Sequence, residues 1–327
     1  GRDVRTTASY SYDIRITMGR LLILLLGLST GLCAADLSLE RLFTRPFLWG
    51  TSPQHPTWSK EGHTLAFLWN AQGRRFLDLY AYHPGRRALV RLTDLESAMD
   101  EINLTVEEKD DRQKHYVAPP AGLSDFHLSR DGSLAAFSCR GDLYTVKTAG
   151  GALPFRLTKT KTAEAGPQLS PDGSKIAYVR DGQLFVQDLS TGQVWQVTGI
   201  DDSGALEDYR WSPDGSRFAC MFRKSPGRKM LLPNYSGRFV TARGFDRTVA
   251  GDEPEELAFS LISADAATTV SIDPGDWGGK IYASLPEWSP DSKRLLLRAV
   301  HPKMKKLRLL VIDPVTGKSA VVNEEAG

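Results

Sequence analysis

The chain has 327 residues, of which 41% are hydrophobic and 24% are charged, a composition typical of a folded protein rather than a disordered one. Its 41 basic and 39 acidic side chains leave a formal net charge of +2. Because so small a net charge creates no strong positive field, neither nucleic acid nor anionic lipid is expected as a partner.

The N-terminal part has the pattern of a secretory signal peptide. A basic residue after Met18 precedes the apolar run 21–28, and small residues follow that run. The run is too short to span a bilayer comfortably, so we predict a signal peptide over residues 18–35 and no stable membrane insertion after its cleavage. Residues 1–17 are then interpreted as an upstream, non-native segment, and the mature protein as periplasmic or secreted. A buried core segment is the alternative.

One turn motif recurs five times along the chain. Each copy has Trp or Leu, then Ser, a variable residue that is Pro in three copies, an acidic residue, and Gly or Ser: Trp58–Gly62, Leu128–Gly132, Leu169–Gly173, Trp211–Gly215 and Trp288–Ser292. Ser, Pro and Gly at the first, second and fourth positions of the turn are the preferences of a type I β-turn. The middle three copies are 41 and 42 residues apart, which is the length of one four-stranded propeller blade.

The segments after each turn predict the remaining strands of a blade. After the copy at 169–173, apolar strands are expected near 176–179, 183–188 and 194–197, which together make an antiparallel meander. The fold class predicted is therefore all-β: a β-propeller of about five four-stranded antiparallel blades. An incomplete ring is expected, which would leave strand edges unpaired. The blades are expected roughly at 56–95, 124–160, 165–200, 206–272 and 284–324, within a propeller over 36–327. A β-sandwich with coincidental turns is the alternative.

Two insertions interrupt the blades. The acidic stretch 94–120 contains a helix-start capping box at 105–108, so we expect a short surface helix near 106–116. The second insertion, about 225–254, separates the second and third strands of the fourth blade and should emerge on one face, where function is often carried. Cys139 and Cys220 fall in non-neighbouring blades, so two buried thiols are expected rather than a disulfide, which needs Cα atoms within about 7 Å.

With its repeats and insertions in this order, the chain resembles the N-terminal β-propeller of the dipeptidyl-peptidase-IV-like branch of the prolyl oligopeptidase family, of bacterial and exported type. The resemblance extends from 37–43, through 104–109 and the repeated turns, to 250–254 and 315–319. It implies that an α/β-hydrolase domain of the same parent chain carries the catalytic Ser, Asp and His, and that the propeller controls which peptide substrates reach them. It also implies that the chain is truncated before that domain, and it allows a homodimer of the parent.

In this family two neighbouring glutamates, ahead of one copy of the turn motif, hold the free amino terminus of the substrate. Two acceptors suit a cationic amine because charge-assisted hydrogen bonds are strong. The corresponding segment here, 200–210, is short and lacks the pair. Glu207 and Asp208 are the candidate substrate-binding residues, as a degenerate substitute, although adjacent strand residues face opposite ways. The other acidic pairs, 107–108 and 255–256, are expected to be solvated.

No catalytic residue is predicted in the chain itself. Its single G-x-S-x-G match, at 27–31, lies in the signal peptide with no strand ahead of it, whereas a nucleophilic serine needs a strand-to-helix turn. The six His residues show no spacing that places two ligands on one helix face, so neither a metal nor a cofactor is predicted. His127 is expected to be a strand residue at a blade edge.

Two functional hypotheses follow. The first is the substrate-gating propeller of an exported serine peptidase, with its catalytic domain absent from this chain. The alternative is a non-catalytic periplasmic propeller, like that of the Tol system, that acts as a binding scaffold. A propeller enzyme whose site lies in the loops stays open as a third. A G-x-S-x-G after a strand in the downstream reading frame would favour the first hypothesis.

Overall fold

A computed structural model describes the chain over residues 38–40, 50–73, 76–95, 121–123, 125–199, 204–224, 228–235, 238–247, 255–303 and 305–326. The upstream segment 1–17, the signal peptide predicted at 18–35 and the helix expected near 106–116 lie outside these stretches. Every strand belongs to one compact unit, residues 52–71 and 75–327. Within the described stretches, no helix combines the length and the apolar character needed to cross a membrane.

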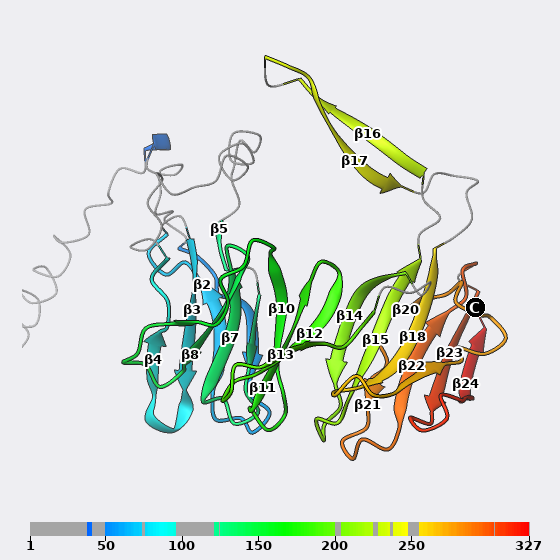
Figure 1. Cartoon of the computed structure of the whole chain (residues 1–327). Helices are drawn as coiled ribbons and strands as arrows, with labels where there is room; N and C mark the ends of the chain where they lie inside the picture. Colours follow the sequence, from blue (N-terminus) through cyan, green and yellow to red (C-terminus); the bar gives the residue numbers. More distant parts are fainter. Residues whose placement is uncertain are drawn as a thin grey trace, which may run out of the picture. The chain divides into compact units, whose positions relative to one another are not determined.

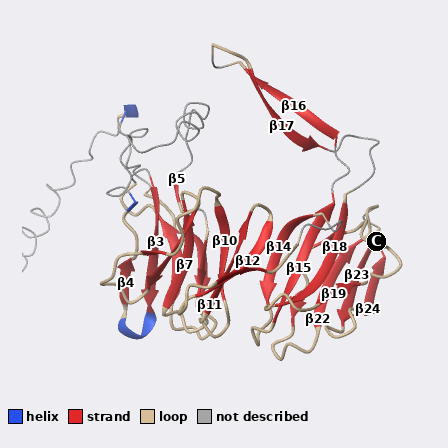
Figure 2. Cartoon of the chain, in the orientation of Figure 1, coloured by secondary structure: helices blue, strands red, loops and turns tan. Residues whose placement is uncertain are grey.

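The first three sheets are antiparallel meanders in which each strand pairs with the next one along the chain (Figures 1 and 2). Sheet 1 contains β1 (Gln54–Trp58), β2 (Leu65–Trp69), β3 (Phe76–His83) and β4 (Ala88–Arg91), with the short β5 (Ala121–Gly122) parallel to β3. Sheet 2 contains β6 (Phe126–Leu128), β7 (Leu134–Cys139), β8 (Asp142–Lys147) and β9 (Phe155–Arg156). Sheet 3 contains β10 (Glu164–Leu169), β11 (Lys175–Arg180), β12 (Gln183–Asp188) and β13 (Val194–Gln196).

The last two sheets follow the same plan, with one addition. Sheet 4 contains β14 (Ala205–Trp211), β15 (Arg217–Lys224), β18 (Glu256–Ser263) and β19 (Thr269–Ile272). Between β15 and β18 the chain forms a separate hairpin of β16 (Arg228–Asn234) and β17 (Thr241–Arg247). Sheet 5 contains β20 (Tyr282–Ala283), β21 (Glu287–Trp288), β22 (Leu295–Val300), β23 (Lys306–Ile312) and β24 (Ser319–Ala326), and both β20 and β21 pair with β22.

The repeated motif forms the corner between the first two strands of each sheet, and short side chains close it. In sheet 3, the Ser170 hydroxyl donates to Asp172 at 2.6 Å and accepts from the amide of Lys175 at 2.9 Å. Gly173 has a φ of +73°, which favours glycine at this position. The Ser–Asp hydrogen bond recurs in sheets 2, 4 and 5. These contacts span at most five residues, so the turn depends on local sequence alone.

A threonine follows the fourth strand in each of the first three sheets, preceded by Leu in two of them and by Val in the third. The Thr93 hydroxyl accepts the backbone amide of Leu79 at 2.9 Å and donates to the Asp78 carboxylate at 2.7 Å. Thr158 and Thr198 accept equivalent amide hydrogen bonds in sheets 2 and 3. The threonine therefore fastens the end of the fourth strand to the start of the third.

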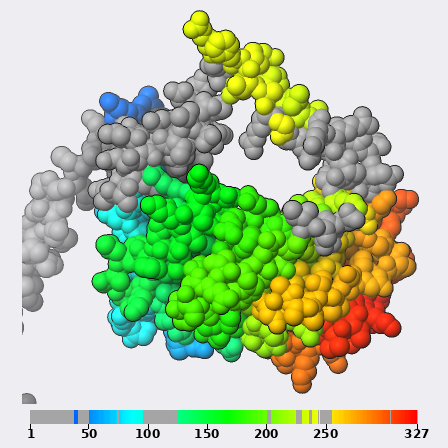
Figure 3. Space-filling view, in the orientation of Figure 1, coloured from blue at the N-terminus to red at the C-terminus, as the bar shows by residue number. Residues whose placement is uncertain are grey.

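Consecutive sheets contact one another through their first strands. His127 of β6 accepts the amide of Leu169 at 3.1 Å, and Trp211 of β14 donates from its indole to Gln168 O at 3.2 Å. Sheets 2 and 3, both green, present one continuous surface in Figure 3. The first strands of all five sheets line a common cavity. This radial arrangement of four-stranded antiparallel sheets confirms the predicted propeller and excludes two stacked sheets.

The two cysteines within the described stretches are free thiols, as predicted. Neither Cys139 of sheet 2 nor Cys220 of sheet 4 is in a disulfide. Cys220 is fully buried and Cys139 is partly exposed, so burial is as expected only for Cys220. Burial raises the pKa of the Cys220 thiol, which keeps this residue a small apolar packing group.

Candidate functional site

Each four-stranded sheet has two ends, which differ in the strand connections that lie there. The corners between first and second strands lie at one end, and we call it the corner end. The connections from the second to the third strand, and from the fourth strand to the next sheet, lie at the opposite end, because successive strands reverse direction. Both insertions, 94–120 and 225–254, interrupt connections of the second kind. We call this the insertion end.

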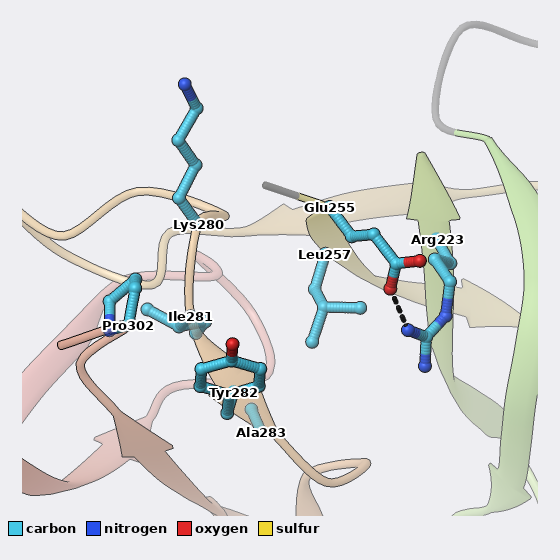
Figure 4. Close-up of a pocket in the computed structure, with 8 residues that line it drawn as sticks. All are labelled: Arg223, Glu255, Leu257, Lys280, Ile281, Tyr282, Ala283 and Pro302. Atoms are coloured by element: carbon cyan, nitrogen blue, oxygen red, sulfur yellow. Dashed lines mark hydrogen bonds and ion pairs between the residues drawn. The ribbon is translucent and has the colours of Figure 1, made fainter. Parts of the chain in front are cut away.

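A pocket of about 320 Å³ opens at the insertion end of sheets 4 and 5. Arg223 at the end of β15 and Glu255 just before β18 form one wall, and Lys280, Tyr282 and Pro302 of sheet 5 and its loops form the other. Figure 4 shows the Glu255 carboxylate facing the Arg223 guanidinium, with the Lys280 side chain pointing away from them. The pocket therefore places charged groups beside an aromatic ring.

Arg223 is the centre of a three-residue ion cluster, which we call the Glu–Arg–Glu cluster. Its Nε and Nη2 donate to the two carboxylate oxygens of Glu207 at 3.0 and 2.9 Å, a bidentate arrangement. Its Nη1 donates to Glu255 Oε2. Hydrogen bonds to Glu207 first, and to Glu255 second, raise the pKa of Arg223 above its usual value. The guanidinium is thus permanently charged and orients both carboxylates.

Two local features bring Glu207 to Arg223. The register of β14 and β15 shifts between Leu206, opposite Phe222, and Asp208, opposite Met221, so Glu207 is the extra residue of a β-bulge. Gly204 has a φ of +104°, and a Cβ there would lie 2.4 Å from the carbonyl oxygen of Arg223. Only glycine allows this close approach of the incoming chain to β15.

A second glycine shapes the opposite wall. A Cβ on Gly279 would lie 2.3 Å from the carbonyl oxygen of Leu257, whose amide donates to Gly279 O at 2.8 Å. The loop therefore packs directly on the start of β18. Leu257 and Ile281, which line the pocket, are both buried and form its apolar part. Tyr282 is 56% exposed, so its ring is accessible to a ligand.

The structure separates the two predicted substrate-binding residues. Glu207 binds Arg223, whereas the Asp208 carboxylate accepts the amide of the next residue at 2.8 Å and contributes to raising the pKa of Cys220. Glu255, expected to be solvated, is instead the carboxylate that shares Arg223 with Glu207. Sequence reasoning missed Glu255 and Arg223 because they lie 48 and 16 residues from Glu207, and only the pairing of β14, β15 and β18 unites them.

The Glu–Arg–Glu cluster can bind a cation. Its two carboxylates and one guanidinium sum to one negative charge, and each carboxylate keeps lone pairs for further donors. The described stretches contain no group of three or more His, Cys, Asp or Glu side chains that could hold a metal ion. His127, at the inner edge of sheet 2, accepts a backbone amide, as expected of a strand residue.

The family model and the curated relative that match this chain both concern dipeptidyl peptidases. The model of the dipeptidyl peptidase IV N-terminal region matches residues 137–327. Dipeptidyl-peptidase 5 of Porphyromonas gingivalis is 32% identical over 119 residues, which cover 30% of this chain and 17% of that protein.

Two solved structures share the fold at low sequence identity. Porphyromonas gingivalis dipeptidyl peptidase 4 is 14% identical, with a TM-score of 0.62 over 84% of this chain and 40% of that one. A putative dipeptidyl aminopeptidase IV from Bacteroides ovatus is 15% identical, with a TM-score of 0.53 over 85% of this chain and 38% of that one. The chain therefore spans well under half the length of each of these proteins.

Proposed function

Because the chain belongs to the family of the dipeptidyl peptidase IV N-terminal region, we propose that it is the substrate-gating propeller of an exported serine peptidase. In this proposal residues 36–327 form the propeller, an α/β-hydrolase domain of the same parent supplies the catalytic residues, and the predicted signal peptide directs the parent to the periplasm or outside the cell. The observation that carries the proposal is the Glu–Arg–Glu cluster beside a pocket at the insertion end.

The cluster suits the free amino terminus of a peptide. An α-amino group is cationic at neutral pH, since its usual pKa is about 7.7–8.0. The cluster carries one net negative charge, which that cation would neutralise. Arg223 holds Glu207 and Glu255 in fixed positions, so little side-chain entropy is lost when the ligand binds. We therefore propose Glu207 and Glu255 as the anchoring carboxylates, and Asp208 only as a neighbour of lesser importance.

The test is a pair of substitutions in the full-length parent. Glu255→Gln removes one anchoring charge but keeps the side-chain size, and it is expected to raise KM for a peptide with a free amino terminus by roughly tenfold, the loss of one charge-assisted hydrogen bond. Its matched control is Glu256→Gln, the adjacent and exposed residue, which should leave KM unchanged.

Three outcomes separate the parts of the proposal. If Glu255→Gln and Glu256→Gln change KM equally, Glu255 is not an anchoring residue. If the unaltered parent has the same KM for free and N-acetylated peptides, the site does not recognise the free amino terminus. If the parent does not react with a fluorophosphonate serine-hydrolase probe, the peptidase function itself is wrong and a non-catalytic binding scaffold replaces it.

We also propose that the parent forms a homodimer through the hairpin β16–β17. Within the described stretches these two strands pair only with each other. The hairpin has many exposed apolar side chains for so short a segment, in β16 and in the connection between its strands: Leu231, Leu232, Tyr235, Phe239 and Val240, each at least 60% exposed. Apolar groups clustered on one exposed element mark an interaction surface, and a second copy is the simplest self-complementary partner.

Charged substitutions in the hairpin are expected to dissociate this dimer. Leu231→Asp with Phe239→Asp places two charges in the apolar surface, so sedimentation velocity should show monomers at micromolar concentration, where the unaltered parent is dimeric. The control, Leu153→Asp in the turn before β9, changes a residue that is 90% exposed outside the hairpin, and should leave the dimer intact. A dimer that survives the double substitution contradicts the proposal.

A further inference from the structure

The cavity at the corner end has no role in the proposed function. Its volume is about 550 Å³, within the range of small-ligand sites, and it shares no residue with the pocket of the Glu–Arg–Glu cluster. Strands β1, β6, β10, β14 and β21 all contribute to its wall, together with the corners that follow them. Its chemistry therefore comes from five separate sheets.

The charges in the wall are predominantly positive. Lys60, Arg130 and Arg210 line the cavity, and Glu287 is the one acidic residue among the described residues of the wall. Arg130 lies 3.6 Å from Glu61, which partly offsets its charge. Among the described residues, neither Lys60 nor Arg210 has a carboxylate within ion-pair distance. The cavity therefore favours an anion.

Two neutral residues that carry a ring N–H, His127 and Trp288, also belong to the wall. The Nδ1 atom of His127 accepts the amide of Leu169 at 3.1 Å, so the ring proton is on Nε2. Burial, together with the nearby charge of Arg210, lowers the pKa of His127 to about 4, which keeps the ring neutral near pH 7. The Trp288 indole N–H has no acceptor among the described residues, whereas the indole of Trp211 donates to Gln168 O at 3.2 Å. Because the Trp288 nitrogen is buried, it is not an accessible donor for a ligand in the cavity.

Apolar surface accompanies the charged groups of the wall. Trp58 is 54% exposed although it lines the cavity, and the side chains of Phe126 and Leu128 are buried beside it. An aromatic ring of this size is an unusual group to leave open to water, and it offers a face on which a ligand ring can stack. A small, fully hydrated anion such as phosphate would leave this surface unused.

We propose that the corner-end cavity binds a carboxylate joined to an apolar group, as a peptide presents at its C-terminus or on an acidic side chain next to an aromatic one. The carboxylate accepts from Arg210 and Lys60, and the apolar neighbour packs on Trp58. This site is independent of the amine site at the insertion end, so either can fail without the other.

The test is a titration of the 327-residue chain, followed by tryptophan fluorescence and calorimetry. The probes are acetyl-Ala-Ala-Phe with a free carboxylate, the same peptide as its C-terminal amide, acetyl-Ala-Glu-Phe amide, and inorganic phosphate. The free acid is expected to bind about tenfold more tightly than the amide, the effect of one charge-assisted contact. If acetyl-Ala-Glu-Phe amide binds tightly, the carboxylate that the cavity recognises is that of an acidic side chain. If it binds weakly, the carboxylate is that of a peptide C-terminus.

Substitutions then locate the site. Arg210→Gln should remove most of the difference between acid and amide, Arg210→Lys should retain part of it, and Lys147→Gln, an exposed lysine outside the cavity, should change nothing. Circular dichroism checks that each variant is folded. Equal binding of acid and amide, equal effects of Arg210→Gln and Lys147→Gln, or phosphate binding as tight as that of the free acid would each overturn the proposal.

Discussion

Replacing Phe218 by Ala is expected to lower the free energy of unfolding by about 3–5 kcal/mol. Phe218 is fully buried in β15, and its ring centroid lies 4.0 Å from that of Trp211 and 6.0 Å from that of Tyr209, both in β14. It belongs to a cluster that includes Leu184 and Val186 of sheet 3, so the cavity left behind would lie between two sheets. Neither sheet can collapse into it without distorting the other.

Urea unfolding followed by circular dichroism measures this effect, because the change in midpoint reports the loss of stability. Leu153→Ala is the control, since Leu153 is 90% exposed outside the proposed dimer surface and should change the free energy of unfolding by less than about 0.5 kcal/mol. A Phe218→Ala variant as stable as the control would mean that sheets 3 and 4 do not share the packed core described here.

The second large effect is expected at Gly317, in the turn between β23 and β24. Its φ is +70°, and a Cβ there would lie 2.1 Å from the carbonyl oxygen of Ser271 in sheet 4. Gly192 occupies the same place in the turn between β12 and β13, with a φ of +74° and no atom within 4 Å of an added Cβ. Both glycine amides donate to the residue four positions earlier, so the two turns are alike.

Alanine at the two positions separates backbone strain from steric overlap. Gly192→Ala should lower the free energy of unfolding by about 1–2 kcal/mol, because an L-residue is strained at positive φ. Gly317→Ala should lower the free energy of unfolding by roughly 1–3 kcal/mol more than Gly192→Ala does, because the added methyl group forces sheets 4 and 5 apart. Thermal and urea unfolding of both variants measure the difference. Equal losses of stability would show that the turn of sheet 5 does not pack on β19.

The propeller could be predicted because its signals are local and repeated. A Ser–Asp hydrogen bond that spans two residues closes four of the five corners, and a glycine with positive φ completes three of these four. The three strands after each corner follow from the apolar segments of the sequence. The same pattern, met five times, favoured a propeller over a β-sandwich before any contact between sheets was known.

The sites could not be predicted to the same degree, and Glu207 shows why. Its sequence neighbour Asp208 was the natural candidate for a second carboxylate, yet a one-residue bulge turns Glu207 toward Arg223 and leaves Asp208 bound to the backbone. Glu255 follows the long insertion, so no spacing rule could connect it with Glu207. A register shift of one residue changes which side chains share a face, and sequence patterns do not specify such shifts.

The amino-acid sequence by itself determined the all-β class, the corners and the order of the strands, since these depend on hydrogen bonds and apolar alternation over a few residues. Tertiary structure alone decided that Arg223 unites two distant glutamates, and that five corners surround a cavity with Arg210, His127 and Trp288 in its wall. The physical reason is that charge and hydrogen-bonding groups act over a few ångströms in space, whatever their separation along the chain.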